Sequence, residues 1–329
     1  MDVYYYKSIQ PNLGDDLNAW LWHRLMPQRL AAFDDTLLLG IGTIIGQRCP
    51  ESARTIVFTS GAGYNAVSSG IDYENWQFLA VRGPLTAEVL ELPRDVAVTD
   101  GAILVSLFPE YFTPVSERQG TVFMPHLSAA RAVDWRPICN AAGIEYLDPR
   151  DEHFTLLKRL GSARLVLADA MHAAIVADSL RVPWIPISTS AEINTFKWLD
   201  WTLSLELPYE PVELLPMSWL QFAQELVIGI TGQRHRVRST DPKSVIAAYR
   251  RLVRRKKERE SQPTRYLNWG VVKGYNWISR REWLATARFN IDSNVACLRR
   301  LQHREGYLST DGVFTARRQE LLRRMDGLL

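Results

Sequence analysis

Short apolar runs alternate with stretches of helical period along the first two thirds of this chain. The apolar runs predict buried strands, and apolar residues spaced three and four apart predict amphipathic helices between them. The predicted strands are Val3 to Tyr6, Thr36 to Ile41, Thr55 to Thr59, Phe78 to Val81, Val96 to Thr99, Thr121 to Met124, Glu145 to Leu147, Leu165 to Leu167 and Trp184 to Ile187. The predicted helices are Asp16 to Leu25, Leu85 to Leu92, Ala129 to Ala142 and Phe154 to Leu160.

This alternation is typical of parallel sheets covered by helices on both faces. The pattern pauses near residues 111–120, and 329 residues exceed what one core usually supports. We therefore expect an α/β protein with two Rossmann-like domains, at residues 1–115 and 116–232. Residues 233–329 are predicted to form a basic, mostly helical C-terminal segment.

One strand–helix–strand unit contains a residue that its pattern does not require. A buried strand ends at the ADA of residues 168–170, and the helical period begins at Met171. His172 therefore lies in the first turn of the helix. Because ligands in open α/β sheets bind beyond the carboxyl ends of the strands, His172 is a candidate functional residue. A buried histidine with backbone partners is the structural alternative.

Polar or glycine-rich stretches follow six other predicted strands: PNLGDD, GIGTIIG, SGAGYN, VRGP, VTDGA and MPHLS. Singly, each has a structural explanation, since aspartates cap helices and turns and an arginine can form a surface ion pair. The glycines of GIGTIIG are spaced one residue too long for the dinucleotide fingerprint GxGxxG, and no acidic residue ends the next strand. This argues against NAD. Together the stretches suit an anionic donor and a hydroxyl acceptor.

Charge is distributed unevenly along the chain. Residues 1–232 hold 16 Lys and Arg against 27 Asp and Glu, whereas residues 233–329 hold 23 against 9, for a net charge of +3. Aromatic residues lie among the charges of the C-terminal segment: Trp269, Tyr275, Trp277, Trp283 and Phe289. Such a segment suits an anionic membrane surface. Alternatively, it pairs with the acidic body, or packs in part and leaves RRLVRRKKERE (250–260) exposed.

The cysteines and the apolar runs bear on the compartment. Cys49, Cys139 and Cys297 are too few and too far apart for a disulfide framework or a metal site, which favours a reducing compartment. The N-terminus MDVYYYKS lacks the regions of a signal peptide. The longest apolar run, residues 218–230, is interrupted by glutamines and a glutamate. We expect a cytoplasmic protein, peripheral on the inner face of the membrane if the basic segment binds it.

Several ordered blocks resemble the polysaccharide pyruvyl transferase family, and most closely its bacterial exopolysaccharide ketal pyruvyl transferases of the succinoglycan and xanthan type. The blocks are NLGDDLNAWLW, LLGIGTII, VFTSGAGY, FLAVRGPLTAEVLELP, VTDGAILV, MPHLS, ADAMHAAIVADSLRVPWIPI and FKWLDW. They cover residues 1 to about 205, and the basic segment matches no motif. Many members carry an arginine two residues before the histidine, where this chain has Ala170. The anion contact of that arginine comes from elsewhere or is absent.

The resemblance implies a glycosyltransferase-B-like pair of domains facing across a cleft. It also implies phosphoenolpyruvate as donor, a sugar of a lipid-linked oligosaccharide as acceptor, and a cyclic pyruvate ketal as product. The chemistry needs no redox cofactor, and the spacing of the aspartates demands no metal. The residues predicted to be catalytic are His172, Asp16 and Asp100. Those predicted to bind substrate are Arg82, Asn12, Gly14, Gly61, His126 and Lys197.

Particular roles follow from the side chains. Arg82 can hold an oxyanion bidentately, and Lys197 supplies a point charge. His172 at a helix N-terminus is predicted to be neutral until a bound phosphate makes it cationic. Asp16 is preferred as the base for the sugar hydroxyls, with Asp100 and His126 as alternatives.

Three other classes of protein remain open. A nucleotide-sugar-dependent glycosyltransferase would share the fold and a sugar acceptor. A nucleic-acid-binding protein would explain the basic run, but the acidic body and its polar loops make nucleic acid an unexpected partner. A non-catalytic assembly factor would turn over no donor.

Overall fold

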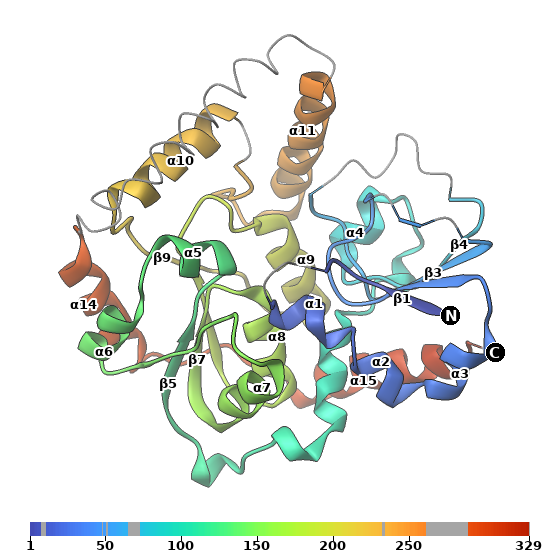
Figure 1. The fold of residues 1–329 in the computed structure, drawn as a ribbon, viewed down its shortest axis with the longest axis horizontal. Helices are drawn as coiled ribbons and strands as arrows, with labels where there is room; N and C mark the ends of the chain where they lie inside the picture. The colour runs from blue at the N-terminus through green and yellow to red at the C-terminus, as the bar shows by residue number, and fades with distance from the viewer. Residues whose placement is uncertain are drawn as a thin grey trace.

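Two parallel sheets form the frame of the protein in a computed structural model, which describes residues 1–7, 11–47, 49–50, 52–64, 73–231, 234–260 and 289–328 (Figure 1). The first sheet has the order β1-β2-β3-β4 and comprises β1 (Asp2–Tyr4), β2 (Thr36–Leu39), β3 (Arg54–Phe58) and β4 (Trp76–Ala80). The second has the order β6-β5-β7-β8-β9 and comprises β5 (Gln119–Met124), β6 (Glu145–Tyr146), β7 (Ala163–Ala168), β8 (Trp184–Ser188) and β9 (Val212–Glu213). The prediction of an α/β protein with one parallel sheet in each half is confirmed.

Helices connect and cover the strands. Those of the first half are α1 (Leu13–Leu17), α2 (Leu21–Leu25), α3 (Pro27–Ala32) and α4 (Pro84–Val89), followed by the 3₁₀ turns η1 (Arg94–Val96), η2 (Gly101–Leu107), η3 (Pro109–Tyr111) and η4 (Val115–Glu117). The second half contains α5 (Leu127–Ala132), α6 (Arg136–Ala142), α7 (His153–Ser162), α8 (Met171–Ser179) and α9 (Thr195–Ser204). The remaining helices are α10 (Trp219–Thr231), α11 (Pro242–Glu260), α14 (Ile291–Leu301) and α15 (Asp311–Asp326).

The helix predicted over Asp16 to Leu25 is divided into α1 and α2. Asn18 lies between the two helices and is fully buried. Its Oδ1 accepts hydrogen bonds from the Ile41 amide (2.8 Å) and from Trp22 Nε1 (2.8 Å), and its Nδ2 donates to the Ile41 carbonyl (2.9 Å). The tertiary contact of one amide side chain with the loop after β2 therefore replaces a helical turn.

Two other predicted elements were wrong, and one short strand was missed. The helix predicted over Ala129 to Ala142 is two helices, because Pro137 in the first turn of α6 cannot continue a preceding helix. The strand predicted over Val96 to Thr99 is a single bridge, between Val81 and Ala97. Strand β9 was not predicted, since Val212–Glu213 is too short to show a period.

Helix α8 lies at the centre of the molecule, against η2 of the first half and against β7 and β8 of the second. Every residue of α8 is buried except His172, which is partly exposed. A helix that is apolar on all sides belongs in an interior. The packing on both halves therefore holds the His172 backbone firmly in place.

The two sheets share one hydrophobic core. Leu38 and Val57 of the first sheet belong to the same buried cluster as Val166 of the second sheet and Ala174 of α8. The domain boundaries at residues 115 and 232 stay predictions.

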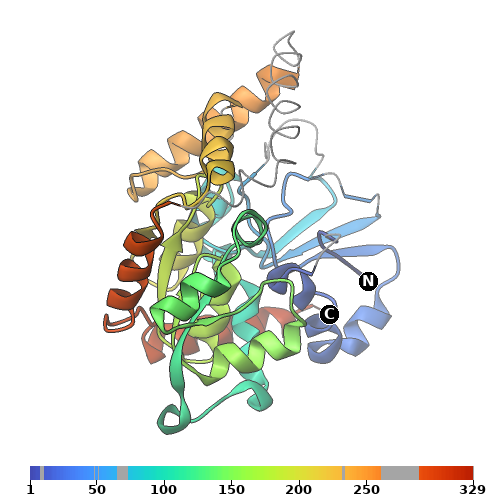
Figure 2. The same ribbon diagram turned by 60° about the vertical axis from the view of Figure 1, so that its left-hand side comes forward.

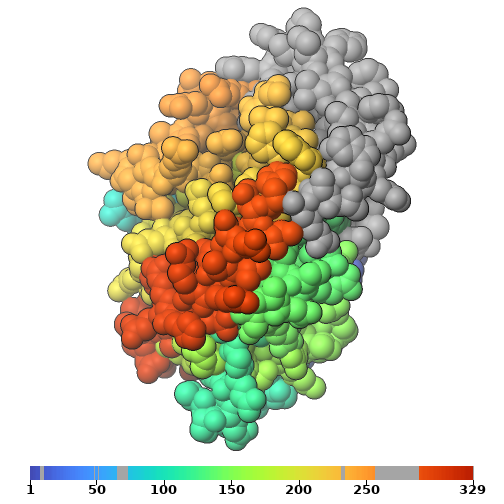
Figure 3. Space-filling view, turned by 90° about the vertical axis from the view of Figure 1, so that its left-hand side faces the viewer, coloured from blue at the N-terminus to red at the C-terminus, as the bar shows by residue number. Residues whose placement is uncertain are grey.

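The last part of the chain packs on the body (Figures 2 and 3). Helix α14 contacts α6, and α15 contacts β4 and η2. Arg324 donates to the carbonyls of Leu79 (2.5 Å) and Asp95 (2.7 Å), and Arg317 donates to the Ser204 carbonyl (2.8 Å). Residues 261–288, which include Trp269, Tyr275, Trp277 and Trp283, lie outside the described residues.

None of the helices described here combines the length and the apolar character needed to cross a membrane.

Candidate active site

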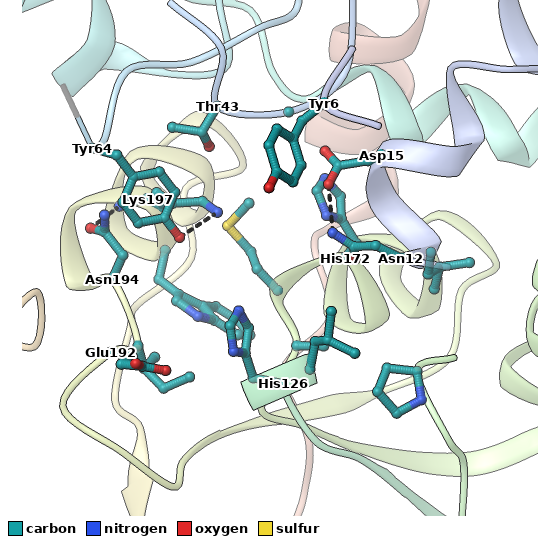
Figure 4. Close-up of a pocket in the computed structure, with 18 of the residues that line it drawn as sticks. Tyr6, Asn12, Asp15, Thr43, Tyr64, His126, His172, Glu192, Asn194 and Lys197 are labelled. Atoms are coloured by element: carbon teal, nitrogen blue, oxygen red, sulfur yellow. Dashed lines mark hydrogen bonds between the residues drawn. The ribbon is translucent and has the colours of Figure 1, made fainter. Parts of the chain in front are cut away.

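A cavity of about 360 Å³ opens at the carboxyl ends of the strands of both sheets (Figure 4). This is where open α/β sheets bind ligands. The polar residues that line it from the first half are Tyr6, Asn12, Asp15, Thr43, Gln47 and Tyr64. Those from the second half are His126, Asp169, His172, Glu192, Asn194 and Lys197. The cavity thus brings together four of the predicted site residues: Asn12, His126, His172 and Lys197.

Lys197 supplies positive charge to the cavity from the first turn of α9. The N-cap residue Asn194 fixes this turn, since its Oδ1 accepts from the Lys197 amide (3.3 Å) and its Nδ2 donates to the Gly63 carbonyl (2.8 Å). Lys197 Nζ donates to the Tyr64 hydroxyl (3.3 Å) and lies 4.9 Å from the centroid of that ring. Among the residues that the structure describes, no carboxylate lies within ion-pair distance of Nζ. Lys197 is therefore available to a bound anion.

His172 faces the cavity from the N-terminal turn of α8, beside Asp15 (Figure 4). Its Nε2 lies 3.8 Å from Asp100 Oδ2, and both atoms are buried with no hydrogen-bond partner among the described residues. Its ring packs on Gly14, where a Cβ would come within 1.8 Å of Nδ1. Burial, followed by the charges of Lys197 and Arg82, lowers the pKa of His172 to about 3. The imidazole is therefore neutral at pH 7.

Asp100 lies behind His172 and does not line the cavity. It caps η2, where its Oδ1 accepts from the Ala102 amide (3.0 Å). Burial raises the pKa of Asp100 to about 6. Its second oxygen faces His172, so this carboxylate can act on a ligand only through the imidazole.

The carboxylate that α1 presents to the cavity belongs to Asp15. It accepts a hydrogen bond from Asn12 Nδ2 (2.5 Å), and burial raises its pKa to about 6. Asp16 instead accepts from the Asn12 amide (2.8 Å) and is not among the lining residues. The base role of Asp16 stays a prediction. Asp15 was not among the predicted site residues, although it follows the N-cap Asn12 by three residues in the first turn of α1.

His126 lies opposite Lys197 and caps α5. Its Nδ1 is 2.8 Å from Ser128 Oγ, and burial together with Lys197 lowers the pKa of His126 to about 4. Asp169, which the sequence did not single out, holds this loop in place. Its Oδ2 accepts from the His126 amide (2.7 Å) and from Thr189 Oγ1 (2.7 Å). The acidic residue of the ADA stretch therefore joins the loops that follow β5 and β8.

Arg82 is fully buried beneath the cavity wall and does not line it. Its Nε pairs with Asp200 Oδ2 (3.0 Å), and its two terminal nitrogens donate to Thr43 Oγ1 (2.9 Å) and to the Ala62 carbonyl (2.6 Å). Gly61 makes room for it, since a Cβ there would lie 2.3 Å from the guanidinium carbon. A direct contact of Arg82 or Gly61 with substrate stays a prediction, while Thr43, which Arg82 holds, does line the cavity.

Other lining residues carried too little signal in the sequence to be selected. Tyr6 ended a predicted strand, yet Figure 4 shows its hydroxyl pointing into the cavity. Tyr64 and Glu192 lie in loops with no helical or strand period. Within the described part of the chain, no group of three or more His, Cys, Asp or Glu residues could hold a metal ion.

The fold and the site define an α/β protein whose cavity combines an available lysine, two neutral histidines and the carboxylates of Asp15, Asp169 and Glu192 at the carboxyl ends of two parallel sheets. Such a cavity suits an anionic ligand beside a hydroxyl-bearing one.

One curated relative is the succinoglycan biosynthesis protein ExoV of Rhizobium meliloti (strain 1021), which is 39% identical over 212 residues. The match covers 64% of this chain and 67% of the relative. The chain belongs to the polysaccharide pyruvyl transferase family, within its exopolysaccharide branch. No family model and no solved structure matches it.

Proposed function

We propose that this protein transfers pyruvate from phosphoenolpyruvate to two hydroxyls of one sugar during exopolysaccharide assembly, and that the acceptor sugar is part of a lipid-linked repeat unit. Family membership and the name of the relative, a succinoglycan biosynthesis protein, support the exopolysaccharide assignment. The observation that carries the donor assignment is Lys197, a cation without a carboxylate partner among the described residues, facing a cavity with two neutral histidines. In this proposal the two halves face each other across the cavity in a glycosyltransferase-B-like arrangement.

The donor is a trianion at neutral pH and needs cations and donors of hydrogen bonds. Lys197 supplies the charge, and the N-terminus of α8 presents backbone amides next to Ala170. In this proposal, these groups supply the anion contact of the arginine that many members of the family carry at the position of Ala170. A bound phosphate dianion raises the pKa of His172, because it offsets the burial cost of the imidazolium. His172 then binds the leaving phosphate as a cation.

The reaction balances without an oxidant or reductant. One sugar hydroxyl oxygen bonds to C2 of the donor as C3 takes a proton. The C2–O bond to phosphorus then breaks, and phosphate leaves with the electron pair. The second hydroxyl oxygen bonds to C2 and closes the ketal. The two sugar hydroxyls release two protons. One restores the acid that protonated C3, and the other leaves with phosphate.

We assign the base role to Asp15 in place of Asp16, because Asp15 faces the cavity and has a pKa near 6. Asn12 holds its carboxylate. Asp100 is a positioning residue, since its Oδ2 beside Nε2 of His172 favours a proton on that nitrogen and leaves Nδ1 as the basic nitrogen of the ring. This arrangement allows His172 to accept and return a proton on its Nδ1 side.

Phosphate release tests this function. Purified protein is incubated with phosphoenolpyruvate and an oligosaccharide repeat unit, and inorganic phosphate is measured with and without the acceptor. We expect acceptor-dependent release, and Lys197→Met should raise the KM for phosphoenolpyruvate at least tenfold, the effect of losing one charge-assisted hydrogen bond. Lys158→Met is the control, since Lys158 is exposed on the surface of α7, and it should not change the KM for phosphoenolpyruvate. Transfer from a UDP-sugar instead of phosphoenolpyruvate would support the glycosyltransferase alternative.

A further inference from the structure

Helix α10 exposes large apolar side chains on its outer face, unlike an ordinary surface helix. Its apolar side chains recur at spacings of three and four and point outward: Trp219 is 49% exposed, Phe222 42%, Leu226 53% and Ile230 67%. The face toward the body carries Gln221, which is 2% exposed, and Ile228, which is 5% exposed. A stripe of four large exposed apolar residues on one face of a helix is typical of a surface that binds a protein or a membrane.

The inward face of α10 holds the loop that follows β8. Gln221 Nε2 donates to the Thr189 carbonyl (3.2 Å), and Glu225 accepts a hydrogen bond from the Ala191 amide. The same loop continues directly into Glu192 and Asn194, which line the cavity. Two hydrogen bonds therefore connect α10 directly to the loop that forms part of the cavity wall.

Cations accompany the apolar stripe. Arg250, Arg251, Arg254 and Arg255 of α11 are exposed, and none of them forms an ion pair with another described residue. The opposite face of α11 is anchored by buried Val245 and Tyr249, which pack toward α9. Figures 1 and 2 show α10 and α11 at the same end of the molecule. Apolar side chains together with exposed arginines match an anionic lipid surface, which offers both acyl chains and negative charge.

We propose that the outer face of α10 and the arginines of α11 dock the protein on an anionic lipid bilayer. With 13 residues α10 is too short to span a membrane, so it lies in the plane of the interface with Trp219, Phe222, Leu226 and Ile230 among the headgroups and upper acyl chains. Docking puts the loop of residues 189–194 at the bilayer surface. That this serves a lipid-linked acceptor rests on the proposed function, whereas the docking itself does not.

Vesicle flotation tests the proposal on the full chain without any substrate. The wild-type protein is mixed with neutral phosphatidylcholine vesicles or with vesicles that contain phosphatidylglycerol, and the floating fraction is measured. We expect binding to the anionic vesicles that weakens as salt is raised. Leu226→Ser with Ile230→Ser should weaken binding at least tenfold, and Arg251→Gln with Arg254→Gln by about thirtyfold, fivefold for each cation.

The control is Val115→Ser, a change at an apolar residue that is 78% exposed in η4. It should float like the wild type. Circular dichroism of each variant checks that the helices are intact. The proposal is wrong if the wild type does not float, if binding ignores lipid charge, or if the α10 variant floats as well as the control.

Light scattering tests the alternative that the outer face of α10 binds a second copy of the chain and not a bilayer. A wild-type dimer that the α10 variant converts to a monomer, with no flotation of either, would overturn membrane docking. Flotation with no phosphate release from phosphoenolpyruvate would leave docking intact and contradict the proposed function. Turnover of a water-soluble acceptor should be unaffected by the α10 substitutions, whereas turnover in vesicles should fall.

Discussion

Replacing Gly14 by alanine should displace His172 from the cavity without unfolding the protein. The added Cβ would lie 1.8 Å from Nδ1, 2.2 Å from Cε1 and 2.3 Å from Cγ of that ring. Non-bonded heavy atoms require about 3.5 Å, so the ring must move by roughly 1.7 Å. Gly14 does not have a positive φ, so alanine fits its backbone without strain. The entire effect therefore falls on the histidine.

The two consequences differ in size. Alanine is favoured over glycine in a helix by about 1 kcal/mol, and overpacking costs about 1–3 kcal/mol, so the free energy of unfolding should fall by about 2 kcal/mol at most. Turnover should fall much further, by about 10²–10⁴-fold, the usual contribution of a positioned proton-transfer group. Steady-state phosphate release and urea denaturation measure the two quantities on the same protein samples.

A double-mutant cycle gives the decisive comparison. Gly14→Ala combined with His172→Ala removes the clash, so the double variant should regain stability yet be no less active than His172→Ala alone. Gly312→Ala in the first turn of α15, where a Cβ meets nothing within 4 Å, is the matched control and should keep full activity. Additive losses in the double variant, or normal turnover of Gly14→Ala, would refute the reasoning.

Three further predictions concern carboxylates. Asp15→Asn should abolish the rise of kcat/KM with pH through about 6, because the base must be ionised and its pKa lies there; a variant with the wild-type pH profile would remove Asp15 from that role. Asp100→Asn should raise the free energy of unfolding at pH 8 by up to about 3 kcal/mol and hardly at all at pH 4. Burial raises the pKa of Asp100 from 3.8 to about 6, so the stability contributed by its neutral form is complete below 3.8 and is lost as pH rises through 6. Urea denaturation at the two pH values checks this, and equal shifts would contradict it. Asp200→Ala should cost about 3–5 kcal/mol in the same denaturation assay, since it leaves the buried Arg82 unpaired, whereas Asp134→Ala at an exposed pair should be nearly silent.

The sequence predicted the sheets because buried parallel strands show continuous apolar runs that depend on local residues alone. It predicted the location of the site for a related reason, since the carboxyl ends of strands are known once the strands are. His172, His126 and Asn12 were therefore placed at the cavity by topology, whereas Lys197 was selected from the family block FKWLDW. The division between α1 and α2 could not be predicted, because it depends on the contact of Asn18 with a loop 23 residues away.

Which side of a short element faces the ligand was the harder question. Asp15 and Asp16 are adjacent in sequence and differ by about 100° around α1, so either could have faced the cavity until the packing of Leu13 and Leu17 fixed the helix rotation. Arg82 has the residue type and position of an anion ligand. Its partner Asp200 lies 118 residues away on α9, and no residue near Arg82 in the sequence indicates this ion pair.

The measurement that tests the central claim most directly is the structure of the product made from isotope-labelled donor. The purified protein is incubated with phosphoenolpyruvate labelled with ¹³C at C3 and an oligosaccharide repeat unit, and the product is analysed by NMR and mass spectrometry. We predict a labelled methyl group on a quaternary ketal carbon joined to two oxygens of one sugar, formed together with one equivalent of phosphate. An unlabelled acceptor, or a labelled enol ether joined to one oxygen only, in reactions where the protein is folded and binds the donor, would contradict the account.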